Sequence, residues 1–183
     1  MYKRVTNQEE LNVFHQIKQV SWEGKGFDME YAKEGSDLFL FYGDDDLPGG
    51  TFEFTPYPQF TSPFMKNLFN DVVQKNMVTV EIDSFSVLPK YRGKLGREII
   101  CFLLDYAKKT GYTHAVAISD PAVFRSFNKT YHIRATQVKE QIWYKGDYVI
   151  PALFHLQEAY DNIHDEKFSW FKQPIEKKEG VLL

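Results

Sequence analysis

Three basic side chains and two glycines stand close together in the run Arg92-Gly93-Lys94-Leu95-Gly96-Arg97. An alternating strand pattern precedes this run, and an apolar helix pattern follows it. In such a turn the first N–H groups of the helix lack intrahelical partners, and the positive end of the helix dipole favours an anion. The spacing therefore predicts a pyrophosphate-binding turn. The alternative is a basic helix start on a solvated face.

Two carboxylates lie shortly before this turn, on a strand predicted for residues 78–87. Because side chains alternate along a strand, Glu81, Asp83 and Phe85 are expected on one face, and Ile82 with the two serines on the other. Two carboxylates on one face would attract a cation. Burial would raise the pKa of Glu81 toward neutrality, which suits a proton acceptor. The alternative for Glu81 is a structural ion pair with an arginine such as Arg134.

The composition fits a single domain over residues 1–183. A chain of this length with 43% hydrophobic residues can bury a proper core, and no repeat or linker divides it. The net charge of -3 gives no general attraction for nucleic acid, so an anion site must be a local basic cluster. The five histidines have no ligand-like spacing, so no metal site is expected.

The N-terminal residues lack the apolar run of a signal peptide, and no stretch approaches the ~20 apolar residues that span a bilayer. We therefore expect a cytoplasmic protein without a membrane partner. Cys101 is the only cysteine, so no intramolecular disulfide is expected. Its place between Ile100 and Phe102 favours core packing over nucleophilic catalysis.

Periodicity and turn residues predict the elements that must position these groups. We expect a first helix up to about residue 22, a β-hairpin of residues 37–42 and 51–57 with three aspartates at a solvated tip, and a helix beginning at Ser62. After the basic turn we expect a helix over 96–109, a strand over 113–118, a helix over 121–129 and two strands within 137–156. Residues 157–183 are expected to form a C-terminal helical extension, with a frayed charged run at 176–179.

The basic turn and its flanks resemble the acyl-CoA-binding segment of the GNAT superfamily of N-acyltransferases. In that family a strand ending in Val-x-Pro leads to an Arg-Gly-x-Gly-x-Gly turn and an apolar helix. The matching residues here are Val87, Pro89, Tyr91, Arg92, Gly93, Lys94 and Gly96. One loop residue, the usual middle glycine, is missing, which bears on whether coenzyme A is the true carrier.

This resemblance implies a fold and a donor site. The order of elements implies an α+β fold with a mixed, mostly antiparallel sheet flanked by helices, whose central strands splay apart to admit the acyl-pantetheine arm. The donor acyl-CoA would contact Phe85, Val87, Arg92, Gly93, Lys94, Leu95, Gly96 and Arg97. The backbone N–H groups of residues 85–87 would hold the developing oxyanion.

The resemblance also implies catalytic roles. Glu81, six residues before Val87, is where many GNAT enzymes place a catalytic glutamate. The tyrosine that protonates the leaving thiolate in many members is replaced by Phe127 here, and Tyr131 is one turn further along. Tyr131 is therefore a candidate acid, with side-chain packing as the alternative. Water can protonate a thiolate if no side chain does.

A narrower resemblance is to the acyl-homoserine-lactone synthases, carried by residues 50–57, 62–69 and 81–87. Glu81 matches their strand glutamate. Glu53 and Ser84 stand where those enzymes have arginines, and this loss of two cations argues against an adenosylmethionine acceptor. We instead expect Glu53 and Asp83 to select a cationic amine.

The expected function is transfer of an acyl group, with acetyl as the first candidate, from acyl-CoA to a small-molecule amine, without a metal. Two alternatives stay open. One is a catalytically silent acyl-CoA-binding or regulatory module, and the other is a lactone-synthase-like enzyme that uses acyl-carrier protein as its partner. The sequence leaves the oligomeric state open.

Overall fold

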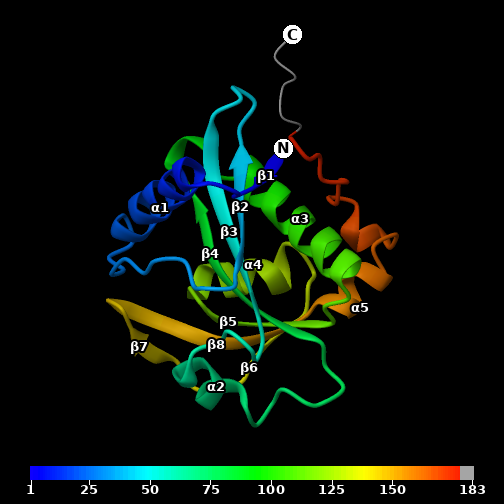
Figure 1. Cartoon of the computed structure of the whole chain (residues 1–183). Coiled ribbons are helices and arrows are strands. Elements are labelled where there is room, and N and C mark those ends of the chain that lie inside the picture. Colours follow the sequence, from blue (N-terminus) through cyan, green and yellow to red (C-terminus); the bar gives the residue numbers. More distant parts are fainter. Residues whose placement is uncertain (178–183) are drawn as a thin grey trace.

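A computed structural model describes residues 1–177 of the chain. Its centre is an eight-stranded sheet, whose strands are labelled in Figure 1. The strand order is β1 (Tyr2–Arg4), β2 (Asp37–Tyr42), β3 (Pro48–Pro56), β4 (Thr79–Val87), β5 (His114–Ser119), β8 (Asp147–His155) and β6 (Ala135–Gln137), and β7 (Ile142–Tyr144) also pairs with β8. Within these residues only β4 and β5 pair in parallel. The expected α+β fold with a mostly antiparallel sheet is confirmed.

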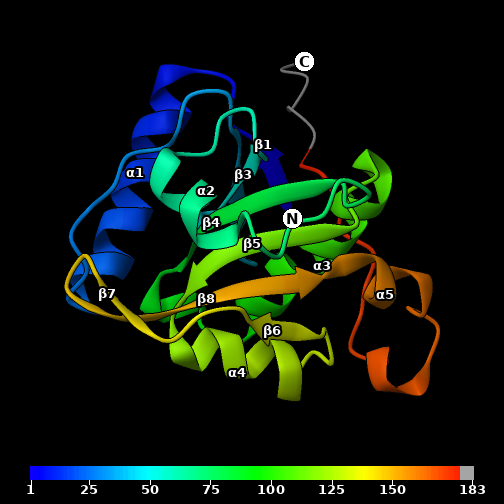
Figure 2. The same ribbon diagram turned by 90° about the horizontal axis from the view of Figure 1, so that it is seen from below.

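Helices cover both faces of the sheet, as the view from below in Figure 2 makes clear. One face carries α1 (Gln8–Glu23), which packs on β2, and α2 (Pro63–Phe69), which packs on Val116 and Leu153. The other face carries α3 (Lys94–Thr110), α4 (Pro121–Lys129) and α5 (Leu156–Asp161). The sheet therefore has an α1 face and an α3 face.

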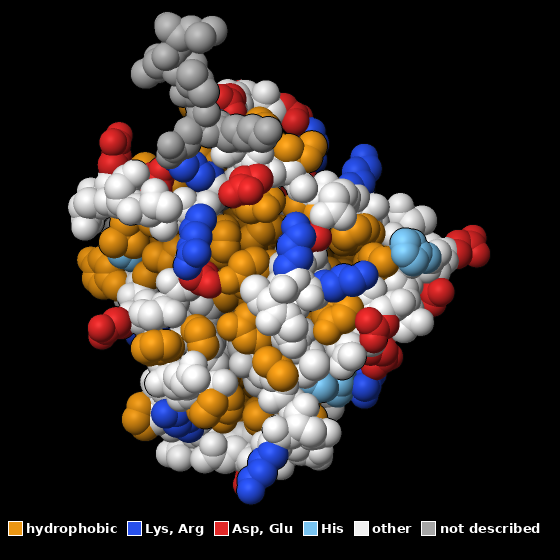
Figure 3. All heavy atoms as spheres, turned by 45° about the vertical axis from the view of Figure 1, so that its right-hand side comes forward, with side chains coloured by type: hydrophobic (Ala, Val, Ile, Leu, Met, Phe, Trp, Pro, Cys, Tyr) orange, Lys and Arg blue, Asp and Glu red, His pale blue; other side chains and the backbone are white. Residues whose placement is uncertain are grey.

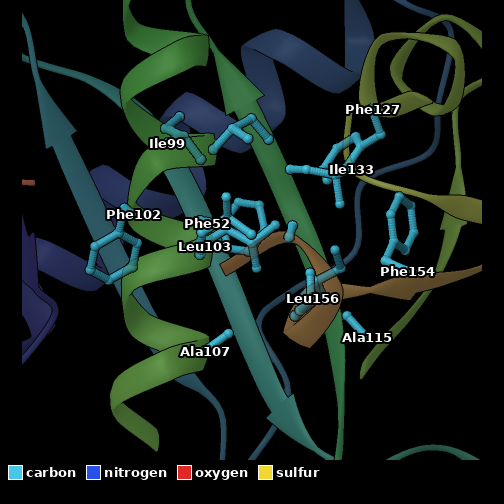
Figure 4. Close-up of a cluster of buried hydrophobic side chains, with 14 of the residues drawn as sticks. Phe52, Ile99, Phe102, Leu103, Ala107, Ala115, Phe127, Ile133, Phe154 and Leu156 are labelled. Carbon is cyan, nitrogen blue, oxygen red and sulfur yellow. The ribbon is translucent and has the colours of Figure 1, made fainter. Parts of the chain in front are cut away.

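The largest hydrophobic cluster lies on the α3 face. Figure 4 shows Ile99, Phe102, Leu103 and Ala107 of α3 pointing toward the sheet. Their spacing is that of one helix face, and every one of them is less than 2% exposed. Gly111 ends the helix with a φ of 81°, a left-handed conformation that glycine adopts without strain. Cys101 of α3 is also buried, as its neighbours predict.

The ends of the chain differ from the expectation. The sequence did not predict β1, a short edge strand paired with β2. In the extension after residue 156, α5 is followed only by a 3₁₀ turn (Glu166–Phe168) among the described residues. Glu176 forms a β-bridge to Tyr2, and Lys177 pairs with Asp46. This half of the charged run is therefore held against β1, while residues 178 and 179 lie outside the described residues.

The centre of the sheet opens between its two parallel strands. Strands β4 and β5 pair only from Thr79↔His114 to Glu81↔Val116, although β4 continues to Val87 and β5 to Ser119. Within residues 1–177 the β5-facing edge of β4 beyond Glu81 thus has no partner strand. This is the splayed arrangement that the sequence resemblance implies.

Candidate active site

A cavity of about 480 Å³ lies where β4 and β5 part. Among the predicted site residues it is lined by Glu81, Asp83, Phe85, Val87, Arg92, Gly93, Gly96 and Tyr131. Glu53, Lys94, Leu95 and Arg97 are not part of its wall. One cavity thus joins the basic turn, the open edge of β4 and the two strand carboxylates.

The strand, turn and helix follow one another as predicted, but α3 begins at Lys94, directly after Gly93, rather than at residue 96. Gly93 has a φ of 89°, which L side chains rarely adopt, so glycine is the residue that suits this position. Arg92 and Arg97 are exposed and form no ion pair with a described residue, which leaves their charges available for an anion. Leu95 is 2% exposed and packs in the core.

The hairpin tip is tied to this turn by ion pairs. Lys94 pairs with Asp44, and Lys90 pairs with Asp45 at 2.5 Å. The hydroxyl of Tyr91 donates to Asp45, 2.9 Å away. The tip is therefore more than a solvated turn, and the Lys94 charge is turned away from the cavity. Figure 3 shows one face of the molecule, on which basic side chains are interspersed with hydrophobic and acidic ones.

A β-bulge in β4 corrects the expected alternation. Glu53 pairs with Asp83 and Thr51 pairs with Ser86, so the single residue between them on β3 opposes both Ser84 and Phe85. Ser84 takes a φ of 56°. An extra residue inverts the order of side chains beyond it. Phe85 therefore packs on the α3 face with Ile82, rather than beside the two carboxylates.

The carboxylates form a buried charge cluster on the α1 face. The ammonium of Lys33, in the loop between α1 and β2, is 2.5 Å from Glu81 Oε1 and 3.0 Å from Asp83 Oδ2. Glu53 is fully buried, where it accepts from the Lys33 backbone N–H at 2.8 Å and from Ser84 Oγ at 2.7 Å. Lys18, also fully buried, approaches Glu53 at 4.0 Å. Glu53 thus lies behind the cavity wall and supports the bulge and the loop.

The two oxygens of the Glu81 carboxylate differ, because only Oε1 contacts the Lys33 ammonium. Its Oε2 is buried and has no hydrogen-bond partner among the described residues. Burial raises the pKa of Glu81, although Lys33 and, to a smaller extent, the Thr61 hydroxyl oppose this. Arg134, the partner considered from sequence, pairs instead with Glu158 at 2.7 Å.

The pKa values of the neighbouring charged groups shift in different directions. Although burial opposes it, Lys33 and Lys18 lower the pKa of Asp83 to about 2. Burial opposes the charge on Lys33 as well, but Asp83 and Glu81 raise its pKa above the ordinary value. Burial and Asp83 raise the pKa of Glu53. The cluster therefore keeps Lys33 and Asp83 charged at neutral pH, and Glu81 is the carboxylate most readily protonated at the cavity wall.

Tyr131 lines the same cavity from the segment after α4. Its ring meets Trp170 edge to face, with centroids 4.9 Å apart. Burial raises the pKa of Tyr131, so the hydroxyl keeps its proton at neutral pH. Phe127, in α4, also lines the cavity but is 2% exposed and cannot donate a proton.

Sequence reasoning missed both lysines of the cluster. Lys18 follows Phe14 and Ile17 on the buried side of α1, and a lysine on an apolar helix face is a signal for a buried partner. Lys33 carried no comparable signal, because it lies in a loop 48 residues before Glu81. The cavity wall also includes Trp22, Phe27 and Tyr144.

Within residues 1–177 no group of three or more His, Cys, Asp or Glu side chains is arranged to hold a metal ion. No helix in the same range is long and apolar enough to cross a membrane.

Comparisons with known proteins give a fold. No family model and no curated protein matches the sequence. Among solved structures, FeeM, an N-acyl amino acid synthase from uncultured soil microbes, aligns with a TM-score of 0.68 and 13% identity over 86% of this chain and 91% of that one. BjaI, a CoA-dependent acyl-homoserine lactone synthase, aligns with a TM-score of 0.69 and 13% identity over 100% and 95%.

A structure described as a candidate N-acetyltransferase from Lactobacillus plantarum aligns with a TM-score of 0.62 and 14% identity, over 85% of this chain and 97% of that one. At such low identities the similarity establishes architecture. The chain has the GNAT-like fold, the architecture that the N-acyl amino acid synthase and the acyl-homoserine lactone synthases share.

Proposed function

We propose that this protein is an N-acyltransferase that moves an acyl group from a coenzyme A thioester to the amine of a small molecule. The observation that carries the proposal is that one cavity between β4 and β5 joins three features. They are a cationic glycine turn, an unpaired strand edge and a carboxylate whose second oxygen makes no hydrogen bond to a described residue. Acyl transfer to an amine needs a site that anchors the acyl donor, N–H groups that stabilise the oxyanion, and a base.

The donor would enter from the turn. Its pyrophosphate would accept from the N–H groups that begin α3 and from Arg92. The pantetheine arm would follow the open edge of β4, which places the thioester carbonyl against the N–H groups of residues 85–87. An acyl-carrier protein presents the same arm, so it is an alternative donor. The cavity volume of about 480 Å³ and apolar wall residues such as Phe52 and Phe154 would suit acyl chains longer than acetyl, and acetyl-CoA remains the first donor to test.

The acceptor would meet the charge cluster. Glu53, Glu81 and Asp83 are opposed by Lys18 and Lys33, so three carboxylates face two ammonium groups. The oxygen without a partner is Glu81 Oε2. An amine arriving as an ammonium ion would supply both the missing charge and the missing donor. A cationic amine is therefore the acceptor class that this wall favours.

The reaction would then proceed with Glu81 as base. Glu81 takes a proton from the ammonium, and the free amine attacks the thioester carbonyl while the β4 N–H groups stabilise the oxyanion. The C–N bond forms first, and the C–S bond breaks as the oxyanion collapses. Tyr131, or water in its place, protonates the leaving thiolate, and the second proton that the nitrogen loses on becoming an amide replaces the one given to the thiolate.

The test is thiol release from acetyl-CoA and octanoyl-CoA, measured with and without a panel of diamines, polyamines and aminoglycoside-like amines. Release that depends on the amine supports the proposal. Coenzyme A binding in calorimetry without release in any mixture would instead support a silent binding module. Release with adenosylmethionine alone would favour the lactone-synthase-like alternative.

A further inference from the structure

The side chain of Lys33 brings an amine of the protein itself next to Glu81, the proposed base. Its Nζ is 2.5 Å from Glu81 Oε1 and 3.0 Å from Asp83 Oδ2. Its side chain is 18% exposed and lines the same cavity as Phe85 and Val87, where the thioester carbonyl would lie. An ammonium of the protein therefore already contacts Oε1 of the carboxylate whose other oxygen, Oε2, would receive the acceptor.

The other lysines near the cavity are placed differently. Lys25 is at the cavity edge but pairs with Asp120 at 2.8 Å, away from Glu81. Lys145 pairs with Glu30 and does not line the cavity. Lys18 is fully buried between Glu53 and the Trp22 ring and does not line the cavity either. Among the described lysines, Lys33 alone combines contact with Glu81 and access to the cavity.

The backbone of Lys33 is held by Glu53, so acylation would require only its side chain to shift. Lys33 lies in residues 24–36, which contain turns but no helix or strand between α1 and β2. A long side chain on such a segment can shift its ammonium toward a bound thioester without disturbing the sheet.

We propose that Lys33 is a self-acylation site, modified by the bound acyl donor when no acceptor is present. The Lys33 ammonium first gives one proton to Glu81, because an ammonium ion has no lone pair; Nζ then bonds to the thioester carbonyl, and the carbonyl–sulfur bond breaks. Of the three ammonium protons, one leaves through Glu81 to solvent, one goes to the leaving thiolate and one stays on the amide nitrogen. No oxidant or second substrate is needed. The inference rests on the proposed acyltransferase function.

One consequence distinguishes this modification from background chemistry. Acylation removes the positive charge of Lys33, which pairs with both Glu81 and Asp83. It also places the new amide where an acceptor would bind. The modified protein should therefore transfer acyl groups to added amines more slowly. Slow chemical acylation of exposed lysines would not have this effect.

The experiment incubates the full chain with acetyl-CoA, and separately with octanoyl-CoA, without added amine. Intact mass and peptide mapping then locate the modification. We expect one dominant acyl group, on Lys33, and at least tenfold lower occupancy of that site in Glu81→Gln. Lys145→Arg is the matched control and should leave the Lys33 occupancy unchanged. Lys33→Arg should remove the dominant modification and leave the background.

Two results would overturn the inference, and they are distinguishable. Modification spread over exposed lysines, with Lys33 unmodified while added amines are acylated, rejects self-acylation but leaves the proposed function standing. Absence of transfer to any amine, together with absence of coenzyme A binding, rejects both. A Glu81→Gln chain that fails to fold, judged by circular dichroism, leaves the site occupancy of the unsubstituted chain as the deciding measurement.

Discussion

The two faces of β4 make opposite contributions to one cavity. On the α3 face, Ile82 and Phe85 pack into the apolar cluster beneath α3. On the α1 face, Glu81 and Asp83 meet Lys33 and, through Glu53, the buried Lys18. The apolar face is held by non-directional burial, whereas the charged face depends on named partners. Under the proposed function, the α3 face would support the fold and the donor turn, while the α1 face would select the acceptor and accept its proton.

The comparison is tested most strongly at Glu81. Replacing Glu81 by Gln should lower kcat by roughly 10²–10⁴-fold, because the amide keeps the shape but cannot take the acceptor's proton. Affinity for coenzyme A should stay nearly intact, since the donor turn is unchanged. Steady-state thiol release with an identified amine and calorimetry with coenzyme A measure the two quantities. Full turnover in this variant would return Glu81 to a structural role.

The next test compares how each face tolerates a lost partner. Glu53→Ala should lower the free energy of unfolding by about 3–5 kcal/mol, because the fully buried Lys18 loses the carboxylate with which it forms an ion pair. Leu103→Ala on the α3 face should cost a similar amount, about 2–5 kcal/mol, through a cavity. Urea unfolding measures both.

A second substitution tests whether the loss of stability on the α1 face comes from an unpaired buried charge rather than from a cavity. Adding Lys18→Met to Glu53→Gln should recover much of the stability lost in Glu53→Gln alone, because no buried charge then lacks a partner. If the double variant is no more stable than the single one, the Lys18–Glu53 pair is not what holds the α1 face together.

The apolar half of this contrast follows from the sequence, and much of the charged half does not. The spacing of Ile99, Phe102 and Leu103 predicts the buried side of α3, and residues 92–97 are enough to predict the glycine turn. Lys33, the partner of Glu81, lies in a loop far away in the sequence, so no local pattern predicts it. Lys18 stands on the apolar side of α1, but that pattern does not identify Glu53 as its partner. The bulge at Ser84 also has no local signal, because it depends on the register with β3. Alternation therefore assigned Phe85 to the wrong face.

The donor turn offers a smaller but sharper test. Arg92 lines the cavity, whereas Lys94 pairs with Asp44. Arg92→Gln should weaken coenzyme A binding by roughly tenfold or more, the size of a lost charge-assisted hydrogen bond. Lys94→Gln should change it by less than about fivefold, as expected for an exposed ion pair. Calorimetry at fixed ionic strength gives both values, and equal losses would mean that Lys94 turns toward the donor when it binds.

The last test concerns acid. Because Lys33 and Lys18 lower the folded-state pKa of Asp83 to about 2, against about 3.9 in an unfolded chain, the folded state binds this proton less tightly. The stability that Asp83 contributes is therefore present above about pH 4 and is lost as the pH falls toward 2. Glu53 and Glu81, whose pKa values are raised, act in the opposite direction.

Asp83→Asn removes the contribution to stability that Asp83 loses at low pH. It leaves the contributions of Glu53 and Glu81, which act in the opposite direction. The loss of urea resistance between pH 5 and pH 2.5 should therefore be smaller in Asp83→Asn than in the parent chain. Asp161→Asn is the matched control, because Asp161 is exposed at the end of α5, and it should lose as much resistance as the parent. If Asp83→Asn and the parent lost equal resistance, Lys33 would not be holding Asp83 in its charged form. The α1 face would then owe its stability to packing, as the α3 face does.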